Sequence, residues 1–229
     1  MIVENIANIK KDITTAALRA NRNPEDIRLV AVSKRFPVEK LQVAINGGQT
    51  LFGENYIQEV QEKKEALGET AQIHFIGNLQ SNKARLAAQN CSMVETVDRY
   101  KIAKALNRHM VEFDRNLDIL IQVNIGDDDN KSGTSKEDVI ELIEQVKTLS
   151  HLNIRGLMTI PPFNNNPEET RIHFSNLRHL RDELQEKAIL TKEESKELSM
   201  GMSGDFLIAI EEGATIVRVG TAIFGSRPY

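Results

Sequence analysis

The chain has 229 residues, of which 40% are hydrophobic and 27% are charged, which is the composition of a folded globular protein. Its 29 Lys and Arg are outweighed by 33 Asp and Glu, and the net charge of −4 excludes a strong basic field for nucleic acid or anionic membranes. The single cysteine, Cys91, excludes an intrachain disulfide. No run reaches the ~18 apolar residues of a membrane span, and charges interrupt the first residues where a signal peptide would be apolar. We therefore expect a cytoplasmic protein with no nucleic-acid or membrane partner.

The N-terminal segment predicts an amphipathic helix. Its apolar residues recur at spacings of three and four, at Ile2, Ile6, Ile9, Ile13 and Ala17. The turn-forming cluster NRNPED that follows predicts the end of this helix.

After this helix, short β-rich runs alternate with longer amphipathic segments. The predicted strands are 28–32, 50–52, 73–76, 93–96, 118–123, 153–158, 197–200 and 215–219. The predicted helices between them are 38–47, 54–67, 81–89, 99–112, 135–149, 168–187 and 204–212. Such alternation implies parallel strands with right-handed crossovers, and eight units favour a single (β/α)8 barrel, with an open doubly wound sheet as the alternative. Because no linker or repeat interrupts the pattern, we expect one domain over residues 1–229.

Lys34 lies just beyond the first predicted strand, where barrel enzymes place their chemistry. A lysine amine beside apolar walls can attack a carbonyl and form a Schiff base. The alternative is a lysine that extends to solvent at a strand end.

Glycines and hydroxyl residues follow the last two predicted strands. Ser203 and Gly204 precede a predicted helix, and Gly220 and Thr221 follow the last strand. Loops after strands 7 and 8 form the recurrent phosphate site of this architecture, because glycines let backbone N–H groups approach an anion. Ordinary helix capping by Ser203 or Asp205 is the alternative. Together with Lys34, this phosphate site predicts a ligand that carries an aldehyde and a phosphate, such as pyridoxal 5′-phosphate.

Arg218 lies within the last predicted strand, where a buried guanidinium needs an acceptor. It either binds a ligand heteroatom, pairs with a carboxylate or faces outward. We expect no metal site, because the five histidines lack zinc spacing and the acidic run 127–129 lacks the other ligands of a calcium loop.

The chain resembles the pyridoxal phosphate homeostasis proteins over essentially its full length. The matching segments are AVSK (31–34), FGENYIQE (52–59), HFIGNLQSNK (74–83), TVDR (96–99), IQVN with the later KSG (121–124 and 131–133), GLMTI (156–160), SMGMSGD (199–205) and VRVGTAIFG (217–225). The resemblance implies a single barrel of the alanine racemase N-terminal type with an extra N-terminal helix.

The resemblance also implies roles for individual residues. Lys34 corresponds to the Schiff-base lysine, and Arg218 to the arginine that faces the pyridine nitrogen in the related racemases. The residues that correspond to phosphate contacts or line the pocket are Ser203, Gly204, Gly220, Thr221, Asn55 and Met202, with His74 and Thr159 as weaker matches.

The function implied is binding of pyridoxal 5′-phosphate for cofactor and amino-acid homeostasis, without established catalysis. Amino acids and apoenzymes that use the cofactor are the implied partners, and we expect a monomer. A racemase would need a second domain that supplies a tyrosine, and no residues follow Tyr229 to build one. The alternatives are a small amino-acid enzyme that uses the same cofactor, such as a weak racemase, and an aldolase-like barrel without cofactor.

Overall fold

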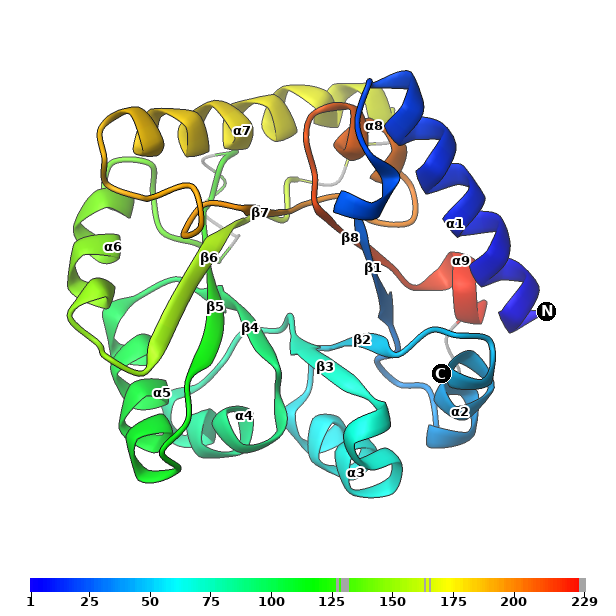
Figure 1. The fold of residues 1–229 in the computed structure, drawn as a ribbon, viewed down its shortest axis with the longest axis horizontal. Helices are drawn as coiled ribbons and strands as arrows, with labels where there is room; N and C mark the ends of the chain where they lie inside the picture. The colour runs from blue at the N-terminus through cyan, green and yellow to red at the C-terminus, as the bar shows by residue number, and fades with distance from the viewer. Residues whose placement is uncertain (127, 129–131, 163, 165, 227–229) are drawn as a thin grey trace.

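The protein is a closed barrel of eight parallel strands, and the computed structural model describes residues 1–126, 128, 132–162, 164 and 166–226 (Figure 1). Each strand pairs with the next in the chain, and β8 pairs with β1. The strands are β1 (Arg28–Val32), β2 (Leu51–Glu54), β3 (Gln72–Phe75), β4 (Met93–Val97), β5 (Leu117–Gln122), β6 (Leu152–Met158), β7 (Glu197–Ser199) and β8 (Ile216–Val219). This topology confirms the predicted (β/α)8 barrel and excludes the open sheet.

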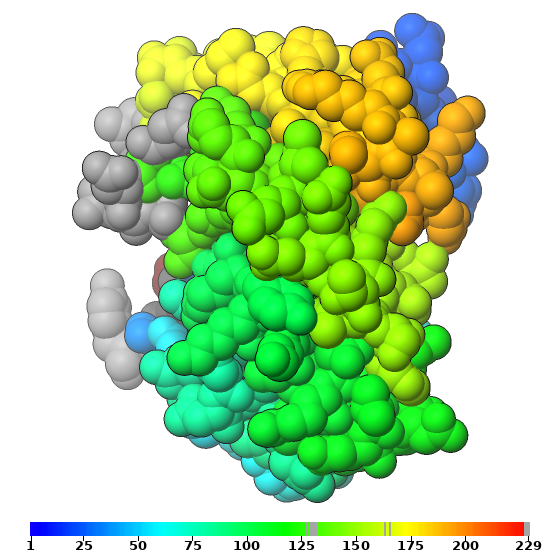
Figure 2. Space-filling model, turned by 90° about the vertical axis from the view of Figure 1, so that its left-hand side faces the viewer, coloured from blue at the N-terminus to red at the C-terminus, as the bar shows by residue number. Residues whose placement is uncertain are grey.

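Helices surround the barrel. They are α1 (Ile2–Arg19), α2 (Val38–Asn46), α3 (Ile57–Leu67), α4 (Ala84–Asn90), α5 (Tyr100–Glu112), α6 (Val139–Lys147), α7 (Arg171–Glu186), α8 (Phe206–Glu211) and α9 (Thr221–Phe224). The extra N-terminal helix α1 packs against α2, α8 and α9 through the apolar stripe expected from its sequence. Figure 2 shows the flank where α5 and α6, in green, lie below α7, in yellow.

Several predicted helix boundaries are wrong, for local reasons. The helix expected from residue 54 begins at Ile57, because Glu54 still belongs to β2. The helix expected from residue 135 begins at Val139, because the Ser135 hydroxyl accepts a hydrogen bond from the Asp138 N–H and forms a turn. The helix expected from residue 168 is preceded by a 3-10 turn at Pro167–Thr170.

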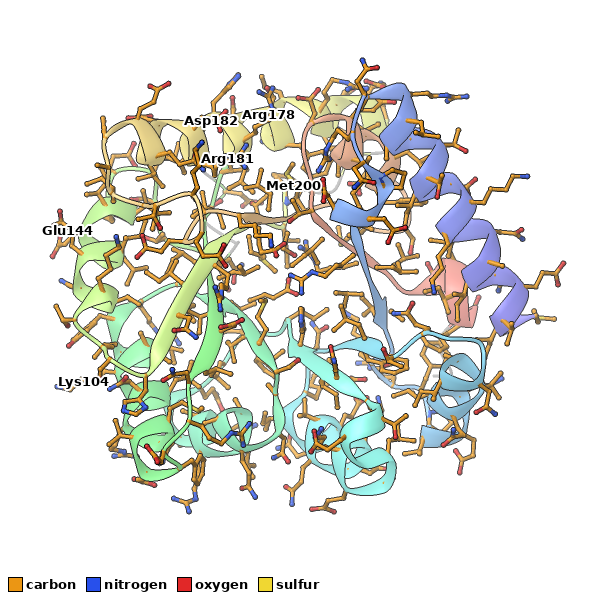
Figure 3. All side chains as sticks on the ribbon, in the orientation of Figure 1. Lys104, Glu144, Arg178, Arg181, Asp182 and Met200 are labelled. Carbon is orange, nitrogen blue, oxygen red and sulfur yellow. The ribbon has the colours of Figure 1, made fainter. Side chains whose placement is uncertain are left out.

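Side chains on successive strand positions point alternately into the barrel and toward the helices. Inside, one small apolar cluster consists of Val30, Met93, Leu120, Met158 and Ile216. Outside, a much larger apolar core lies between strands and helices, while charged side chains such as Lys104 of α5 and Glu144 of α6 point away from it (Figure 3).

Candidate functional site

A cavity of about 300 Å³ lies at the carboxyl ends of the strands. All eight residues predicted for the cofactor site line it, namely Lys34, Asn55, Met202, Ser203, Gly204, Arg218, Gly220 and Thr221. Residues that were not predicted for the cofactor site complete the wall, among them Ile76, the run Ile160–Pro162 and Asp205. The structure thus brings together residues from positions 34 to 221 in one pocket.

Lys34 is presented by a tight turn at the end of β1. The Phe36 N–H donates to the Ser33 carbonyl over 3.0 Å and closes the turn, and Arg35 has a φ of 65°. Val32 and Lys34 line the pocket, whereas Ser33 between them is buried with its hydroxyl on the Glu54 carboxylate. The turn therefore directs Lys34 into the pocket, where the residue is half-buried.

Two loops form the opposite wall. The Gly220 N–H donates to the Ser203 hydroxyl over 3.2 Å, which joins the loop after β7 to the loop after β8. Thr221 begins α9, and the first hydrogen bonds in this helix run from the N–H groups of Ile223 and Phe224 to the Gly220 carbonyl. The Thr221 N–H thus precedes the first intrahelical bond and is one of the amides that a helix start leaves for other acceptors.

Asp205 is a pocket residue that sequence reasoning treated only as a cap. Its side chain does not cap α8 in the usual way but accepts a hydrogen bond of 2.6 Å from the Met202 N–H. Burial raises the pKa of this carboxyl above its ordinary value, against the lowering effects of that hydrogen bond and of Arg218. Asp205 therefore fixes the Met202–Gly204 turn from within.

Arg218 is 3% exposed and enters the pocket from β8. Its guanidinium donates to the Ser199 hydroxyl over 2.5 Å and to the Thr159 carbonyl over 2.8 Å. The Ser199 hydroxyl in turn donates to Glu95 over 2.5 Å, and Arg218 Nη1 lies 3.9 Å from the same carboxylate. Arg218 therefore faces the pocket and has a carboxylate partner, so the alternative of an outward-facing side chain is wrong, while binding of a ligand heteroatom stays a prediction.

The other oxygen of Glu95 lies 2.6 Å from His74 Nδ1. Burial alone would raise the pKa of the Glu95 carboxyl, but the hydrogen bond and charge of His74, with Arg218 and Ser199, hold that pKa below its ordinary value. The carboxylate therefore remains charged and stabilises the guanidinium. His74 and Thr159, the weaker matches, lie behind the pocket wall and support Arg218.

Asn55 forms the wall between the pocket and a neighbouring cavity that Tyr56 and Lys83 line. Its Oδ1 is buried and has no hydrogen-bond partner within the described residues. A Cβ on Gly77 would lie 2.2 Å from the Asn55 carbonyl oxygen, so only glycine lets this loop approach so closely. An unsatisfied buried oxygen at the pocket wall is a group that a polar ligand could satisfy.

Within the described part of the chain, no group of three or more His, Cys, Asp or Glu could hold a metal ion. Of the acidic run 127–129, only Asp128 lies inside that part. None of the described helices is long and apolar enough to cross a membrane.

Comparison with known proteins defines the class. The sequence profile of the alanine racemase N-terminal domain matches residues 5–228, so the barrel is of the alanine racemase N-terminal type. An alanine racemase of Clostridium difficile has the same fold, with a TM-score of 0.76 at 17% identity over 99% of this chain and 58% of the racemase.

More similar relatives define the family within that class. Proteins named pyridoxal phosphate homeostasis protein are 42% identical in Haemophilus influenzae, over 100% of this chain and 97% of that protein, and 40% identical in Schizosaccharomyces pombe, over 95% and 91%. PipY of Synechococcus elongatus, solved with PLP bound, superposes with a TM-score of 0.84 at 35% identity, covering 98% of this chain and 100% of PipY. The chain belongs to the family of pyridoxal phosphate homeostasis proteins.

Proposed function

We propose that this protein binds pyridoxal 5′-phosphate in the pocket and serves the homeostasis of this cofactor and of amino and keto acids, without catalytic turnover. The observation that carries the proposal is that one cavity is lined by Lys34, by Arg218 and by the hydroxyl residues Ser203 and Thr221. The names of the relatives and the cofactor bound to PipY support it.

The residues present fit the chemical groups of this cofactor. When bound, the cofactor supplies an aldehyde carbon, a phosphate dianion and a pyridine ring. The Lys34 amine is the nucleophile that would hold the aldehyde carbon. The hydroxyls of Ser203 and Thr221, with the backbone N–H groups of Gly204 and Thr221, would hold the phosphate. The orphaned Asn55 Oδ1 is available to a donor on the ligand.

Arg218 would face the ring as a donor that stays charged. A guanidinium has no acceptor and cannot be deprotonated in a protein. Burial lowers the pKa of Arg218 from its ordinary value, and the charges of Glu95 and Asp205 raise it again. The group therefore offers hydrogen bonds and positive charge to a ligand heteroatom.

We propose that residues 1–229 act as one cofactor-binding domain, that the protein is a cytoplasmic monomer, and that amino acids and apoenzymes are its partners. The strict alternation of strands and helices supports the single domain, and the free thiol of the buried Cys91 agrees with a reducing compartment.

Lysine trapping tests the function. Purified protein is incubated with pyridoxal 5′-phosphate and reduced with borohydride, and the modified lysine is located by peptide mass spectrometry. We expect the modification on Lys34, its loss in Lys34→Ala, and its retention in the control Lys83→Ala, because Lys83 lines the neighbouring cavity. Lys34→Ala should still retain some cofactor through the phosphate contacts. Modification that remains on other lysines in Lys34→Ala, at wild-type yield, would refute the assignment.

A further inference from the structure

A buried ionic cluster lies directly behind Lys34, on the outer side of β1 and β2. Lys63 of α3 is 2% exposed, and its ammonium donates to Glu54 over 2.7 Å, to Glu59 over 2.8 Å and to the Ser33 carbonyl over 2.8 Å. A lysine is almost never buried unless it is fully paired, and the three acceptors here satisfy its three N–H donors.

The cluster holds the backbone on both sides of Lys34. The Ser33 carbonyl that accepts from Lys63 is also the acceptor that closes the turn, from the Phe36 N–H. On the other side, the Arg35 N–H donates to the Glu59 carboxylate over 2.7 Å. One ammonium therefore ties together the residue before Lys34 and the carboxylate that binds the residue after it.

The turn needs such support. Arg35 has a φ of 65°, a left-handed conformation that is unfavourable for a residue other than glycine. The conformation persists only where the surroundings fix it. Without the cluster, the turn would relax, and the Lys34 amine would lose its fixed position in the pocket.

We propose that Lys63, with Glu54 and Glu59, is a positioning residue that fixes the turn at Ser33–Phe36. It thereby sets the rate at which the Lys34 amine attacks the cofactor aldehyde, a step in which a C=N bond replaces the C=O bond and the oxygen leaves as water. The inference rests on the proposed function, because it concerns the covalent step at Lys34. Positioning of a nucleophile is worth large factors in rate, and a shift of about 1 Å costs about 100-fold.

The charge of the cluster changes near neutral pH. Burial raises the pKa of the Glu54 carboxyl to about 7, against the opposing effects of Lys63 and Ser33, and Glu59 raises it further. Glu54 also acts on the Cys91 thiol, and burial raises the pKa of that thiol to about 12, so it stays neutral. Above pH 7 the ionised Glu54 binds Lys63 more strongly, so the turn should be held most firmly there.

The test compares two adjacent lysines of α3 in the full chain freed of cofactor. Lys63→Met removes the buried ammonium, whereas Lys64→Met removes one that binds the exposed Glu69 and the Ala71 carbonyl. Pyridoxal 5′-phosphate is mixed with each protein, and the absorbance change of the covalent link is followed. We expect the rate to fall about tenfold or more in Lys63→Met, as for a lost charge-assisted hydrogen bond, and to stay within twofold in Lys64→Met.

A second probe separates positioning from general damage to the pocket. Pyridoxine 5′-phosphate has an alcohol in place of the aldehyde and measures the other contacts alone. We expect Lys63→Met to bind it within twofold of the wild-type affinity, and hydrogen exchange at the Arg35 amide to become faster. Equal losses for both ligands, or unchanged exchange at Arg35, would overturn the inference. If the wild-type protein forms no link at Lys34, the proposed function fails instead.

Glu59→Ala serves if Lys63→Met does not fold, because Glu59 is partly exposed and its loss frees the Arg35 N–H. The control is Glu65→Ala, which removes an exposed acceptor for Gln61 on the same helix. Glu54→Gln tests the pH dependence, since the amide keeps the size of the side chain and cannot ionise. We expect the ratio of wild-type to Glu54→Gln rates to rise through pH 7, and a ratio that is constant between pH 6 and 8 would contradict the titration of Glu54 near neutral pH.

Discussion

Arg218 and Ser199 are joined by a hydrogen bond of 2.5 Å between neighbouring strands inside the barrel. The serine hydroxyl can donate only one proton, and that proton goes to Glu95. The hydroxyl therefore orients the carboxylate toward the guanidinium. The Arg218 guanidinium in the pocket is stabilised by Glu95, which is not among the residues that line the pocket.

Replacing Glu95 with Gln should destabilise the fold strongly. The buried Arg218 would lose its carboxylate, and breaking a buried charge pair costs about 3–5 kcal/mol. Urea unfolding at pH 7 measures the change, with the exposed Glu39→Gln of α2 as the control, for which no measurable change is expected. A loss equal to that of the control would contradict a charged role for Glu95.

The pair of Glu95 and Arg218 also predicts that the protein becomes less stable as the pH falls. The pKa of Glu95 is lower in the folded protein than its ordinary value of 4.5. The unfolded chain therefore binds the proton more readily, and the stabilisation is complete above pH 4.5 and is lost as the pH falls below it. Unfolding curves between pH 3 and 6 should show this loss in the wild-type protein and a smaller loss in Glu95→Gln.

The barrel could be predicted because its signal is local. Each strand is a short β-rich run and each helix is an amphipathic segment. Their alternation can therefore be recognised from the sequence pattern alone, without knowledge of tertiary contacts. The pocket residues could be predicted for a related reason. Lys34, Ser203 and Thr221 lie just beyond strands, and barrel closure brings all such positions to one face.

The networks behind the pocket could not be predicted in this way. His74, Glu95, Ser199 and Arg218 come from four strands, and nothing in their local sequence shows that they point inward at the same level. Lys63 lies in a helix rich in Glu and Lys, where a charged residue is ordinarily solvent-exposed. Only the packing of α3 on β2 and β3, with the hydrogen bonds from Lys63 to Glu54 and Ser33, shows that this ammonium is buried.

Ser203→Ala and Thr221→Val should each weaken cofactor retention without unfolding the protein. Each change removes one hydroxyl donor to a dianion, a loss of roughly 1–3 kcal/mol for a hydrogen bond to a charged group. Equilibrium dialysis with pyridoxal 5′-phosphate measures the affinity, and thermal unfolding verifies the fold. Ser203→Ala also removes the acceptor of the Gly220 N–H, so it should have the larger effect. Unchanged affinity in the double variant would contradict the phosphate site.

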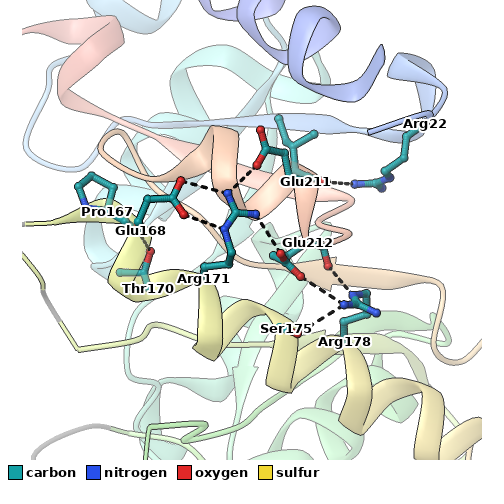
Figure 4. A network of polar contacts seen from close by, with 10 residues as sticks. Arg22, Pro167, Glu168, Thr170, Arg171, Ser175, Arg178, Glu211 and Glu212 are labelled. Carbon is teal, nitrogen blue, oxygen red and sulfur yellow. Dashed lines mark hydrogen bonds and ion pairs between the residues drawn. The ribbon is translucent and has the colours of Figure 1, made fainter. Parts of the chain in front are cut away.

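Arg171 joins the start of α7 to the end of α8 close to the pocket. Its guanidinium pairs with Glu168, Glu211 and Glu212 at 2.7–2.9 Å, and Arg178 binds Glu212 from two turns further along α7 (Figure 4). These carboxylates raise the pKa of Arg171 above its ordinary value.

Arg171→Ala should lower the free energy of unfolding by about 1 kcal/mol, since partly exposed ion pairs are worth little singly and more in networks. Pro167 and Thr170, which precede Arg171, line the pocket, so cofactor affinity should also fall by a small factor. Urea unfolding at low and high salt measures the stability, and the difference between variant and wild type should shrink as salt screens the network. A difference that is independent of salt would contradict an electrostatic origin.

The protein with its cofactor should exchange the Cα hydrogen of amino acids only slowly. Racemisation needs an acid–base group on each face of the reacting carbon, and the titratable side chains that line the pocket in the described part of the chain are Lys34, Asp205 and Arg218. Arg218 cannot accept a proton, and Asp205 is held by the Met202 N–H in the turn.

Of the tyrosines, Tyr56 lines the neighbouring cavity and is 45% exposed, and Tyr100 packs at the start of α5. Lys34 could therefore serve one face, with no tyrosine opposite it among the residues described. The measurement is deuterium incorporation at Cα of several amino acids, followed by chiral analysis, with Lys34→Ala as the control. Slow exchange with retention of configuration is the expected result. Fast, Lys34-dependent exchange with inversion would instead establish a small racemase, and Asp205→Asn would then show whether that carboxyl is the second acid–base group.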